Sequence, residues 1–233
     1  MSATPIEAML FDKDGTLFDF HATWSVWAHD AILDLAEGDM DLARHVAREM
    51  LYDYEKMEFL PASPFIASTN RQCAEHLAAV LPRTTVDEIE GFLSRSAVSA
   101  PLQPAVPLAP FLDELAGQGV VLGVMTNDAE LVAHAQLRSA GVADRFAFIA
   151  GFDSGHGAKP DPDPLLAFAA VAGVAPSRTV MVGDSTHDLV AGRAAGMLTL
   201  GVLTGTALTE DLAAYADAVL PDIGHIPAWM ATR

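Results

Sequence analysis

The feature that most constrains the fold is a short apolar run near the N-terminus that ends in two acidic residues. Residues 6–11 (Ile-Glu-Ala-Met-Leu-Phe) are mostly apolar, and the run stops at Asp12, Lys13 and Asp14, followed by Gly15. A run of this length that ends at a glycine favours a buried strand over a buried helix. Asp12 and Asp14 are two residues apart, so their side chains share one face of a continuing strand. Two carboxylates held together need a shared proton or a nearby cation.

Beyond residue 110 the chain alternates between helical and strand patterns, which is typical of an α/β protein. The predicted strands are 120–125, 146–150, 179–182, 198–203 and 218–220, the last as an edge strand. The predicted helices are 111–117, 129–140, 163–172 and 186–195. Strands separated by helices pair in parallel through right-handed crossovers. We therefore expect a parallel sheet, flanked by helices, that includes residues 6–11.

An all-helical block separates the first strand from the rest of this sheet, and residues 19–100 show no convincing strand pattern. The predicted helices begin at Thr23, at Asp39 or Asp41, near Ile66, and at Thr85, where Glu88 completes a capping box. A proline-rich linker at 100–110 follows. We predict a discontinuous core domain of residues 1–18 and 104–233, and an inserted helical domain of residues 19–103.

Composition narrows the possible functions and locations. The 233-residue chain has 51% hydrophobic residues and a net charge of −18, which fits a globular protein and argues against nucleic-acid binding. The one cysteine, Cys73, excludes an internal disulfide, and its helical surroundings argue against a nucleophile. The sequence shows no signal peptide, and its longest apolar stretch is too short for a bilayer. We expect a cytoplasmic protein with no membrane partner.

Polar side chains follow three of the predicted strands. Asp12 and Asp14 follow the first strand, Thr126 and Asn127 the second, and Asp184 a third. Each group alone is also typical of an ordinary turn or helix N-cap. The carboxyl ends of parallel strands lie at one edge of a sheet, so these groups should converge there. Hydroxyl and amide groups at a helix start suit a phosphate, and clustered carboxylates suit Mg²⁺.

Two further residues join this predicted site. Asp188 lies one helical turn after Asp184, although it is also consistent with a solvated helix position. Lys159 follows the glycine-rich segment 155–157 and precedes Pro160. A lone loop lysine is usually solvated, but this site needs a cation to balance several carboxylates and a phosphate. We therefore predict that Lys159 lies with the acidic residues.

Four of these groups, in chain order, resemble the motifs of the haloacid dehalogenase superfamily of hydrolases. They are Asp12-Lys-Asp-Gly-Thr-Leu, Thr126-Asn127, Lys159-Pro160 and Gly183-Asp184-Ser-x-x-Asp188. The helical block resembles the cap of the phosphoglycolate phosphatase type in that superfamily. The resemblance covers nearly the whole chain. It implies a Rossmann-like parallel sheet with an inserted α-helical cap.

The resemblance also implies roles for the site residues. Asp12 would be the nucleophile and Asp14 the general acid and base. Gly15, Thr126, Asn127 and Lys159 would bind the phosphate, and Lys159 would also steady the nucleophile. The residues implied for Mg²⁺ are Asp12, the carbonyl of Asp14, and Asp184, with Asp188 in support.

This assignment implies a Mg²⁺-dependent phosphatase that acts on a small phosphorylated metabolite of the phosphoglycolate type through an aspartyl-phosphate intermediate. A carboxylate nucleophile splits phosphoester hydrolysis into two easier steps. A phosphomutase would use the same residues, although Thr16 stands where sugar-phosphate mutases often carry valine. A non-catalytic phospho-ligand binding protein is a third possibility. A dehalogenase is less favoured because it needs neither Asp14 nor a metal.

Substrate specificity should depend on the cap and on the segment after the first motif. His21, Trp24 and Trp27 are the candidate substrate-binding residues there. The alternative is that the tryptophans are bundle core and that His21 is solvated. Strand alternation predicts that the Lys13 side chain points away from Asp12 and Asp14, and so takes no part in the chemistry.

Overall fold

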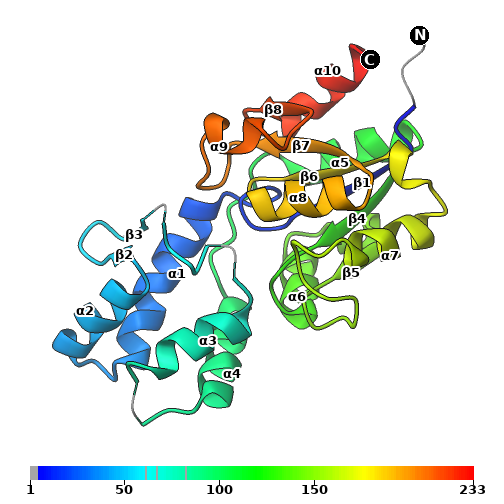
Figure 1. The fold of residues 1–233 in the computed structure, drawn as a ribbon. Helices are drawn as coiled ribbons and strands as arrows, with labels where there is room; N and C mark the ends of the chain where they lie inside the picture. The colour runs from blue at the N-terminus through cyan, green and yellow to red at the C-terminus, as the bar shows by residue number, and fades with distance from the viewer. Residues whose placement is uncertain (1–4, 61, 67, 82) are drawn as a thin grey trace.

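The computed structural model describes residues 5–60, 62–66, 68–81 and 83–233. Residues 1–4 of the predicted core domain lie outside this part. Six strands form one parallel sheet in the order β5-β4-β1-β6-β7-β8 (Figure 1). The strands are β1 (Ala8–Phe11), β4 (Val121–Met125), β5 (Phe148–Ala150), β6 (Thr179–Gly183), β7 (Leu198–Val202) and β8 (Ala218–Leu220). The predicted α/β class and the edge position of β8 are confirmed.

The central strand β1 lies between β4 and β6, and all four of its residues are buried. Its last residue, Phe11, is in register with Val124 of β4 and Val182 of β6. Since the three strands are parallel and end at nearly the same level, the residues that follow them emerge at one edge of the sheet.

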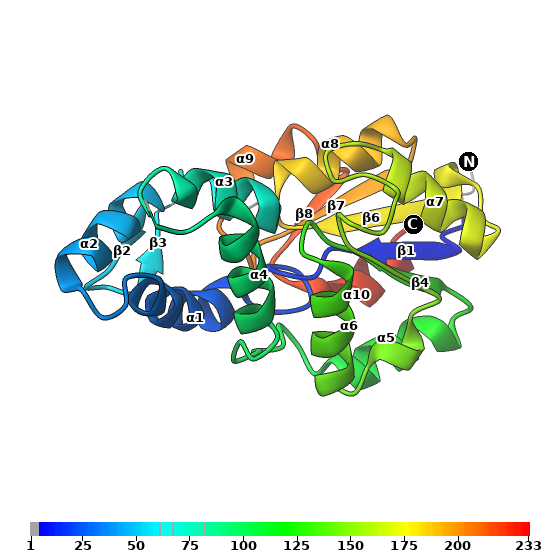
Figure 2. The ribbon, with the colours of Figure 1, turned by 90° about the horizontal axis from the view of Figure 1, so that it is seen from below.

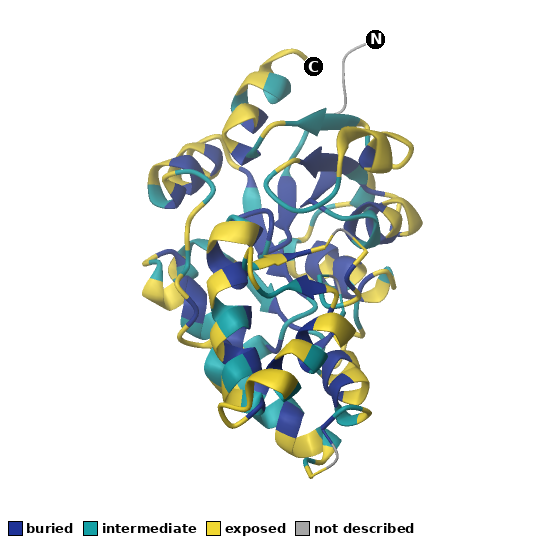
Figure 3. Cartoon of the chain, turned by 90° about the vertical axis from the view of Figure 1, so that its left-hand side faces the viewer, coloured by how far each residue is buried: buried dark blue, intermediate teal, exposed yellow. Residues whose placement is uncertain are grey.

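Helices cover both faces of the sheet. They are α5 (Leu108–Gly117), α6 (Glu130–Ser139), α7 (Asp163–Ala172), α8 (Thr186–Ala194), α9 (Thr209–Ala213) and α10 (Ile226–Ala231). Figure 2 shows α7 and α8 on one face and α5, α6 and α10 on the other. Phe11 packs with Leu112 of α5, whereas Leu10 packs with Phe168 of α7, as the two-residue period of a strand requires. Figure 3 shows the buried strands in dark blue between helices with yellow outer faces.

The segment between β1 and α5 forms a helical bundle with its own hydrophobic cluster, which includes Ile32, Val46, Leu77 and Ile89. Its helices are α1 (Phe20–Leu35), α2 (Met40–Glu49), α3 (Asn70–Ala78) and α4 (Val86–Ala97). Figures 1 and 2 place α4 beside α6, and the Gln136 side-chain amide of α6 donates to the Ala97 carbonyl at 2.8 Å. The bundle therefore sits against the helices of the sheet.

Local capping explains where the helix boundaries differ from the predictions. Asp19, not Thr23, caps α1, because its Oδ1 accepts from the Ala22 N–H at 2.8 Å. Helix α3 begins at Asn70, because Thr69 and Gln72 form a capping box. The predicted helix from Ile66 is thus too long, and Ala67 within it lies outside the described residues.

Two other predictions about the segment between β1 and β4 are wrong. The block predicted to lack strands contains a short antiparallel pair, β2 (Tyr52–Asp53) and β3 (Glu58–Phe59). Two-residue strands are too short to show a two-residue period in the sequence. Helix α5 begins at Leu108, inside the predicted linker, because Pro107 and Pro110 occupy its N-cap and first turn, where proline is tolerated. None of the described helices is long and apolar enough to cross a bilayer.

Candidate active site

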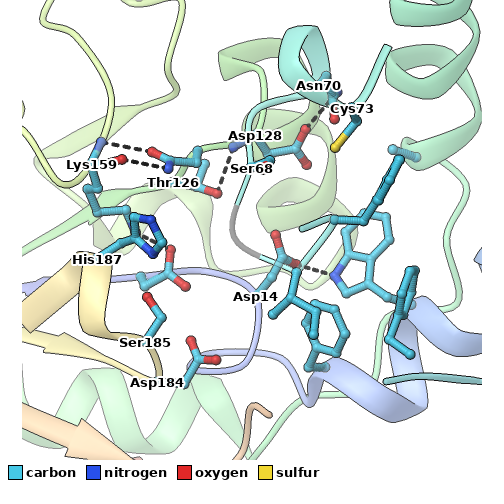
Figure 4. Close-up of a pocket in the computed structure, with 18 of the residues that line it drawn as sticks. Asp14, Ser68, Asn70, Cys73, Thr126, Asp128, Lys159, Asp184, Ser185 and His187 are labelled. Carbon is cyan, nitrogen blue, oxygen red and sulfur yellow. Dashed lines mark hydrogen bonds and ion pairs between the residues drawn. The ribbon is translucent and has the colours of Figure 1, made fainter. Parts of the chain in front are cut away.

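A pocket lies where the carboxyl ends of β1, β4 and β6 face the helical bundle (Figure 4). Nine of the residues predicted from the sequence line it: Asp12, Asp14, Trp24, Trp27, Thr126, Asn127, Lys159, Asp184 and Asp188. They come from segments far apart in the chain. The parallel order of the strands brings the residues of the sheet domain together, as the sequence predicts, whereas α1 of the bundle supplies Trp24 and Trp27.

Asp12 is held by a lysine from the loop between β5 and α7. The Nζ of Lys159 lies 2.5 Å from Oδ1 of Asp12 and 2.6 Å from Oδ1 of Asp188. All three residues are buried. The other carboxylate oxygen of Asp188 accepts from the Ser185 N–H at 3.0 Å and so caps α8. Asp188 therefore connects the start of α8 to the lysine that holds Asp12.

Burial and neighbouring charges both shift the pKa values of the residues in this cluster. Burial raises the pKa of Asp12 to about 7, although the Lys159 ammonium acts in the opposite direction. Burial also raises the pKa of Asp184 well above its ordinary value, and the Asp12 and Asp188 carboxylates raise it further. Burial alone would lower the pKa of Lys159, but the same two carboxylates outweigh it and raise that pKa. One lysine therefore does not balance three buried carboxylates, and a further cation would.

Glycines make room for the carboxylates. A Cβ on Gly15, which has φ +82°, would lie 2.3 Å from Oδ2 of Asp184, and one on Gly205 would lie 1.7 Å from the same atom. A Cβ on Gly183 would lie 2.3 Å from the Cβ of Asp188. The backbone thus approaches the acidic side chains more closely than any other residue would permit. The N–H of Gly15, a predicted phosphate donor, donates instead to the Phe18 carbonyl at 2.7 Å.

The acidic cluster fits a divalent cation. Asp12, Asp184 and Asp188 each offer a carboxylate oxygen, these oxygens lie within 4.8 Å of one another, and all three residues are buried. Oxygen ligands without sulfur suit Mg²⁺. The glycines described above leave space around Asp184. The donor set and its surroundings therefore fit a divalent metal ion.

The segment after β4 contributes Thr126 and Asn127. The Thr126 hydroxyl accepts from the Asp128 N–H at 3.1 Å and lines the pocket. The Asn127 side-chain amide donates to the Lys159 carbonyl and accepts from the Lys159 N–H, both at 2.9 Å. Asn127 therefore positions the backbone of Lys159, a contact that its sequence motif does not reveal.

The predicted direction of the Lys13 side chain is wrong. Its side chain is fully buried, and its Nζ lies 2.5 Å from Oδ2 of Asp14, 2.5 Å from Oε1 of Gln136 and 3.4 Å from Oδ2 of Asp128. The chain leaves the strand conformation after Phe11 and turns, so the alternation of side chains stops there. Burial alone would lower the pKa of Lys13, but Asp14 and Asp128 raise it, and the lysine remains charged.

The other oxygen of Asp14 is bound from the helical bundle. The indole N–H of Trp24 donates to Oδ1 of Asp14 at 2.8 Å, and Figure 4 shows this bond. The indole of Trp27 packs edge-on against Trp24 with ring centroids 5.0 Å apart, and its N–H donates to the Ser96 hydroxyl at 3.2 Å. Trp24 is therefore both a buried bundle residue and a direct partner of a site carboxylate.

One predicted residue lies outside the pocket, and several of the lining residues were not predicted from the sequence. His21 is exposed on α1 and is not among the described residues that line the pocket. The missed apolar residues are Phe20, Phe59, Phe65, Ile66, Leu93 and Ala97. The missed polar residues include Ser68, Asn70, Ser185 and His187. Ser185 and His187 are neighbours of Asp184 and Asp188 in the sequence, and that position could have indicated them. In the helical block, the sequence does not distinguish side chains that face the pocket from side chains of the hydrophobic core.

The pocket also contains Cys73 of α3, but its environment suppresses thiol reactivity. Cys73 is buried, and burial raises the pKa of its thiol to about 12. Since the thiolate is the nucleophilic form, this burial disfavours Cys73 as a nucleophile. The expectation that Cys73 is not a nucleophile agrees with its surroundings.

Known proteins share this sequence pattern and fold. A family model described as haloacid dehalogenase-like hydrolase matches residues 6–196. The chain is 32% identical to the phosphoglycolate phosphatase of Neisseria meningitidis serogroup A over 239 residues, covering 95% of this chain and 91% of the relative.

Solved structures show the same architecture. The crystal structure of a predicted phosphoglycolate phosphatase from Haemophilus somnus 129pt superposes with a TM-score of 0.71 at 20% identity, covering 98% of both chains. A β-phosphoglucomutase from Clostridium difficile has a TM-score of 0.65 at 17% identity, covering 97% of this chain and 98% of that one. These likenesses show the fold, and the family model spans most of the sequence. The chain therefore belongs to the haloacid dehalogenase-like hydrolases.

Proposed function

We propose that this chain is a Mg²⁺-dependent phosphatase that hydrolyses a small phosphorylated metabolite through an aspartyl-phosphate on Asp12. One observation carries the proposal. The Asp12 carboxylate is bound by Lys159 and grouped with Asp184 and Asp188, and Asp14 lines the same pocket. The proposed nucleophile, its lysine partner and the proposed acid thus lie around one space. The relative from Neisseria meningitidis, which is named a phosphoglycolate phosphatase, supports this activity.

In the first step, a carboxylate oxygen of Asp12 attacks the phosphorus, and the bond from phosphorus to the ester oxygen breaks. Asp14 gives its proton to the departing alkoxide. In the second step, Asp14 removes a proton from water, which attacks the phosphorus and releases inorganic phosphate and the free Asp12 carboxylate. Lys159 balances charge on the transferring group, and the Thr126 hydroxyl lines the same space.

The proposed Mg²⁺ ligands are Asp12, Asp184 and the carbonyl of Asp14, with Asp188 supporting the site through Lys159. A bound Mg²⁺ would neutralise charge on the phosphate oxygens and thereby allow a carboxylate to approach a dianion. The protein's own contribution is to hold Asp12 in place. The buried Lys159 bond fixes the side chain of this nucleophile.

We also propose that residues 19–103 act as a cap over a core of residues 1–18 and 104–233. The bundle supplies one wall of the pocket, including Trp24 and Trp27. A mobile cap would exclude water during the first step and admit it for the second. A cytoplasmic location belongs to this proposal, supported by the buried free thiol of Cys73.

A chromogenic phosphate ester with and without Mg²⁺ tests the proposal. We expect phosphate release with Mg²⁺, none with EDTA, and none from Asp12→Asn. Intact-protein mass spectrometry after rapid acid quenching should show one added phosphoryl group in the wild type but not in Asp12→Asn. Undiminished turnover by Asp12→Asn would reject the mechanism. A phosphomutase would instead convert a sugar phosphate to its isomer without net release of phosphate.

A further inference from the structure

The wall of the pocket opposite the phosphate-binding groups has no charged side chain among the described residues. The helical bundle builds this wall, and its apolar members include Trp24, Trp27, Phe65, Ile66 and Leu93. Ser68 and Asn70 are its polar members. A leaving group bound beyond the phosphate would therefore lie against aromatic and aliphatic side chains.

The lysines near the pocket are already paired. Lys159 is the one lysine or arginine among the described lining residues, and two carboxylates bind it. Lys13 is not a lining residue, is fully buried, and lies between Asp14 and Asp128. His187 lies on the phosphate side in Figure 4, at the start of α8, and not on the bundle wall. The bundle wall thus offers no counter-charge for a second anion.

The ionisable side chains that line the pocket next to this wall are acidic, and Lys13 already pairs with both of them. Asp14 and Asp128 both line the pocket beside the bundle wall. The side-chain amide of Asn70, a wall residue, donates to Oδ1 of Asp128 at 3.2 Å. A carboxylate on the leaving group would lie near Asp14, which must approach the ester oxygen. Against apolar side chains, an unpaired carboxylate loses its hydration and gains no partner in return.

Resting on the proposed phosphatase function, we propose that the natural leaving group is an uncharged alcohol with a largely apolar surface. Its apolar part would pack against Trp24 and Trp27, whose rings lie edge to face. The Ser68 hydroxyl and the Asn70 amide would bind a neutral polar group. The substrate class is thus a neutral alkyl or arylalkyl phosphate monoester, which differs from the substrate named for the Neisseria relative.

Matched pairs of substrates test this inference by changing one charge at a time. The first pair is phosphoglycolate and its neutral amide, and the second is 4-carboxybenzyl phosphate and benzyl phosphate. With Mg²⁺ we expect kcat/KM to be about 10-fold or more lower for the charged member of each pair, since its carboxylate is left without a partner. We also expect kcat/KM to be higher for benzyl phosphate than for the neutral amide of phosphoglycolate.

A variant that adds a cation to the wall provides the second test. Ser68→Lys should raise kcat/KM for the carboxylate esters relative to their neutral partners, whereas Ser177→Lys, exposed and outside the lining, should not. Equal or faster hydrolysis of phosphoglycolate than of its amide by the wild type would overturn the inference but leave the phosphatase proposal intact. An unchanged ratio in folded Ser68→Lys would also overturn it. Failure to hydrolyse any of the four esters would overturn both proposals.

Discussion

The Nζ of Lys13 donates to Oδ2 of Asp14 at 2.5 Å, although the two residues are adjacent in the chain. Adjacent side chains on a strand point to opposite faces. Here the backbone turns, and the Leu17 and Phe18 N–H groups both donate to the Lys13 carbonyl at 3.0 Å. The turn directs the lysine into the protein, where it meets Asp14, Asp128 and Gln136. A residue with no predicted part in the chemistry thus positions the proposed acid.

Lys13→Met should destabilise the protein strongly. The substitution leaves the Asp14 and Asp128 carboxylates without their buried cation, and breaking a buried pair in this way costs about 3–5 kcal/mol. Urea unfolding measures the loss. The double variant Lys13→Met/Asp128→Asn should recover part of it, because one of the two unpaired charges is removed. Strictly additive losses would show that Lys13 and Asp128 are not coupled.

Asp14→Asn should separate esters by their leaving groups. The variant retains the Asp12 nucleophile but loses the proton donor, and such assistance is typically worth about 10²–10⁴-fold. The loss should be large for an alkyl phosphate and smaller for the first step of an aryl phosphate, whose leaving group needs little protonation. Single-turnover kinetics with both esters measures this difference. Equal rate losses for the two esters would mean that Asp14 is not the general acid, because the benefit of protonating a leaving group depends on which leaving group departs.

Asp184→Asn should raise the Mg²⁺ concentration needed for activity steeply. Asp184 is buried beside Asp12 and Asp188, and its substitution removes one of the clustered carboxylates. Activity measured against Mg²⁺ concentration reports the change. Asp34→Asn, which changes an exposed carboxylate on α1, is the matched control and should leave the requirement as it is. Ca²⁺ should support turnover poorly, since its looser coordination misplaces the reacting oxygens.

In EDTA, the contribution of Asp12 to the stability of the protein should fall as pH rises from about 4 to about 7. Burial raises the pKa of Asp12 from 3.8 to about 7, so the folded protein keeps a proton that the unfolded chain releases. The unfolded state then binds fewer protons across this interval, and the free energy of unfolding decreases with pH. Asp12→Asn lacks this group, so its melting temperature relative to the wild type should increase across the same interval. A constant difference would contradict the prediction.

Mg²⁺ should reverse the loss of stability at higher pH, because the cation competes with protons for the carboxylates of the site. The rise in melting temperature on adding Mg²⁺ should therefore grow from pH 5 to pH 8. The increase should be smaller in Asp12→Asn, which lacks one proposed ligand. A rise in melting temperature that does not vary with pH would separate metal binding from the Asp12 carboxylate.

The sequence by itself determined the sheet and the convergence of Asp12, Thr126, Lys159 and Asp184. Strand and helix periods are local, and parallel pairing then brings the strand ends to one edge. Capping residues likewise located the start of α4, because the reciprocal bonds of Thr85 and Glu88 join residues within one turn. These features depend on neighbours a few positions apart.

Only the tertiary structure decided which side chains face the pocket and what they bind. Lys13 meets Gln136, a partner 123 residues away, and Trp24 of the bundle binds Asp14, whereas His21 three positions earlier is exposed. Pocket wall and bundle core are both apolar, so hydrophobic periodicity does not tell them apart. The direction of the Lys13 side chain depended on a turn that ends the strand period. Its burial became favourable only once the packed fold supplied two carboxylates and an amide around the ammonium.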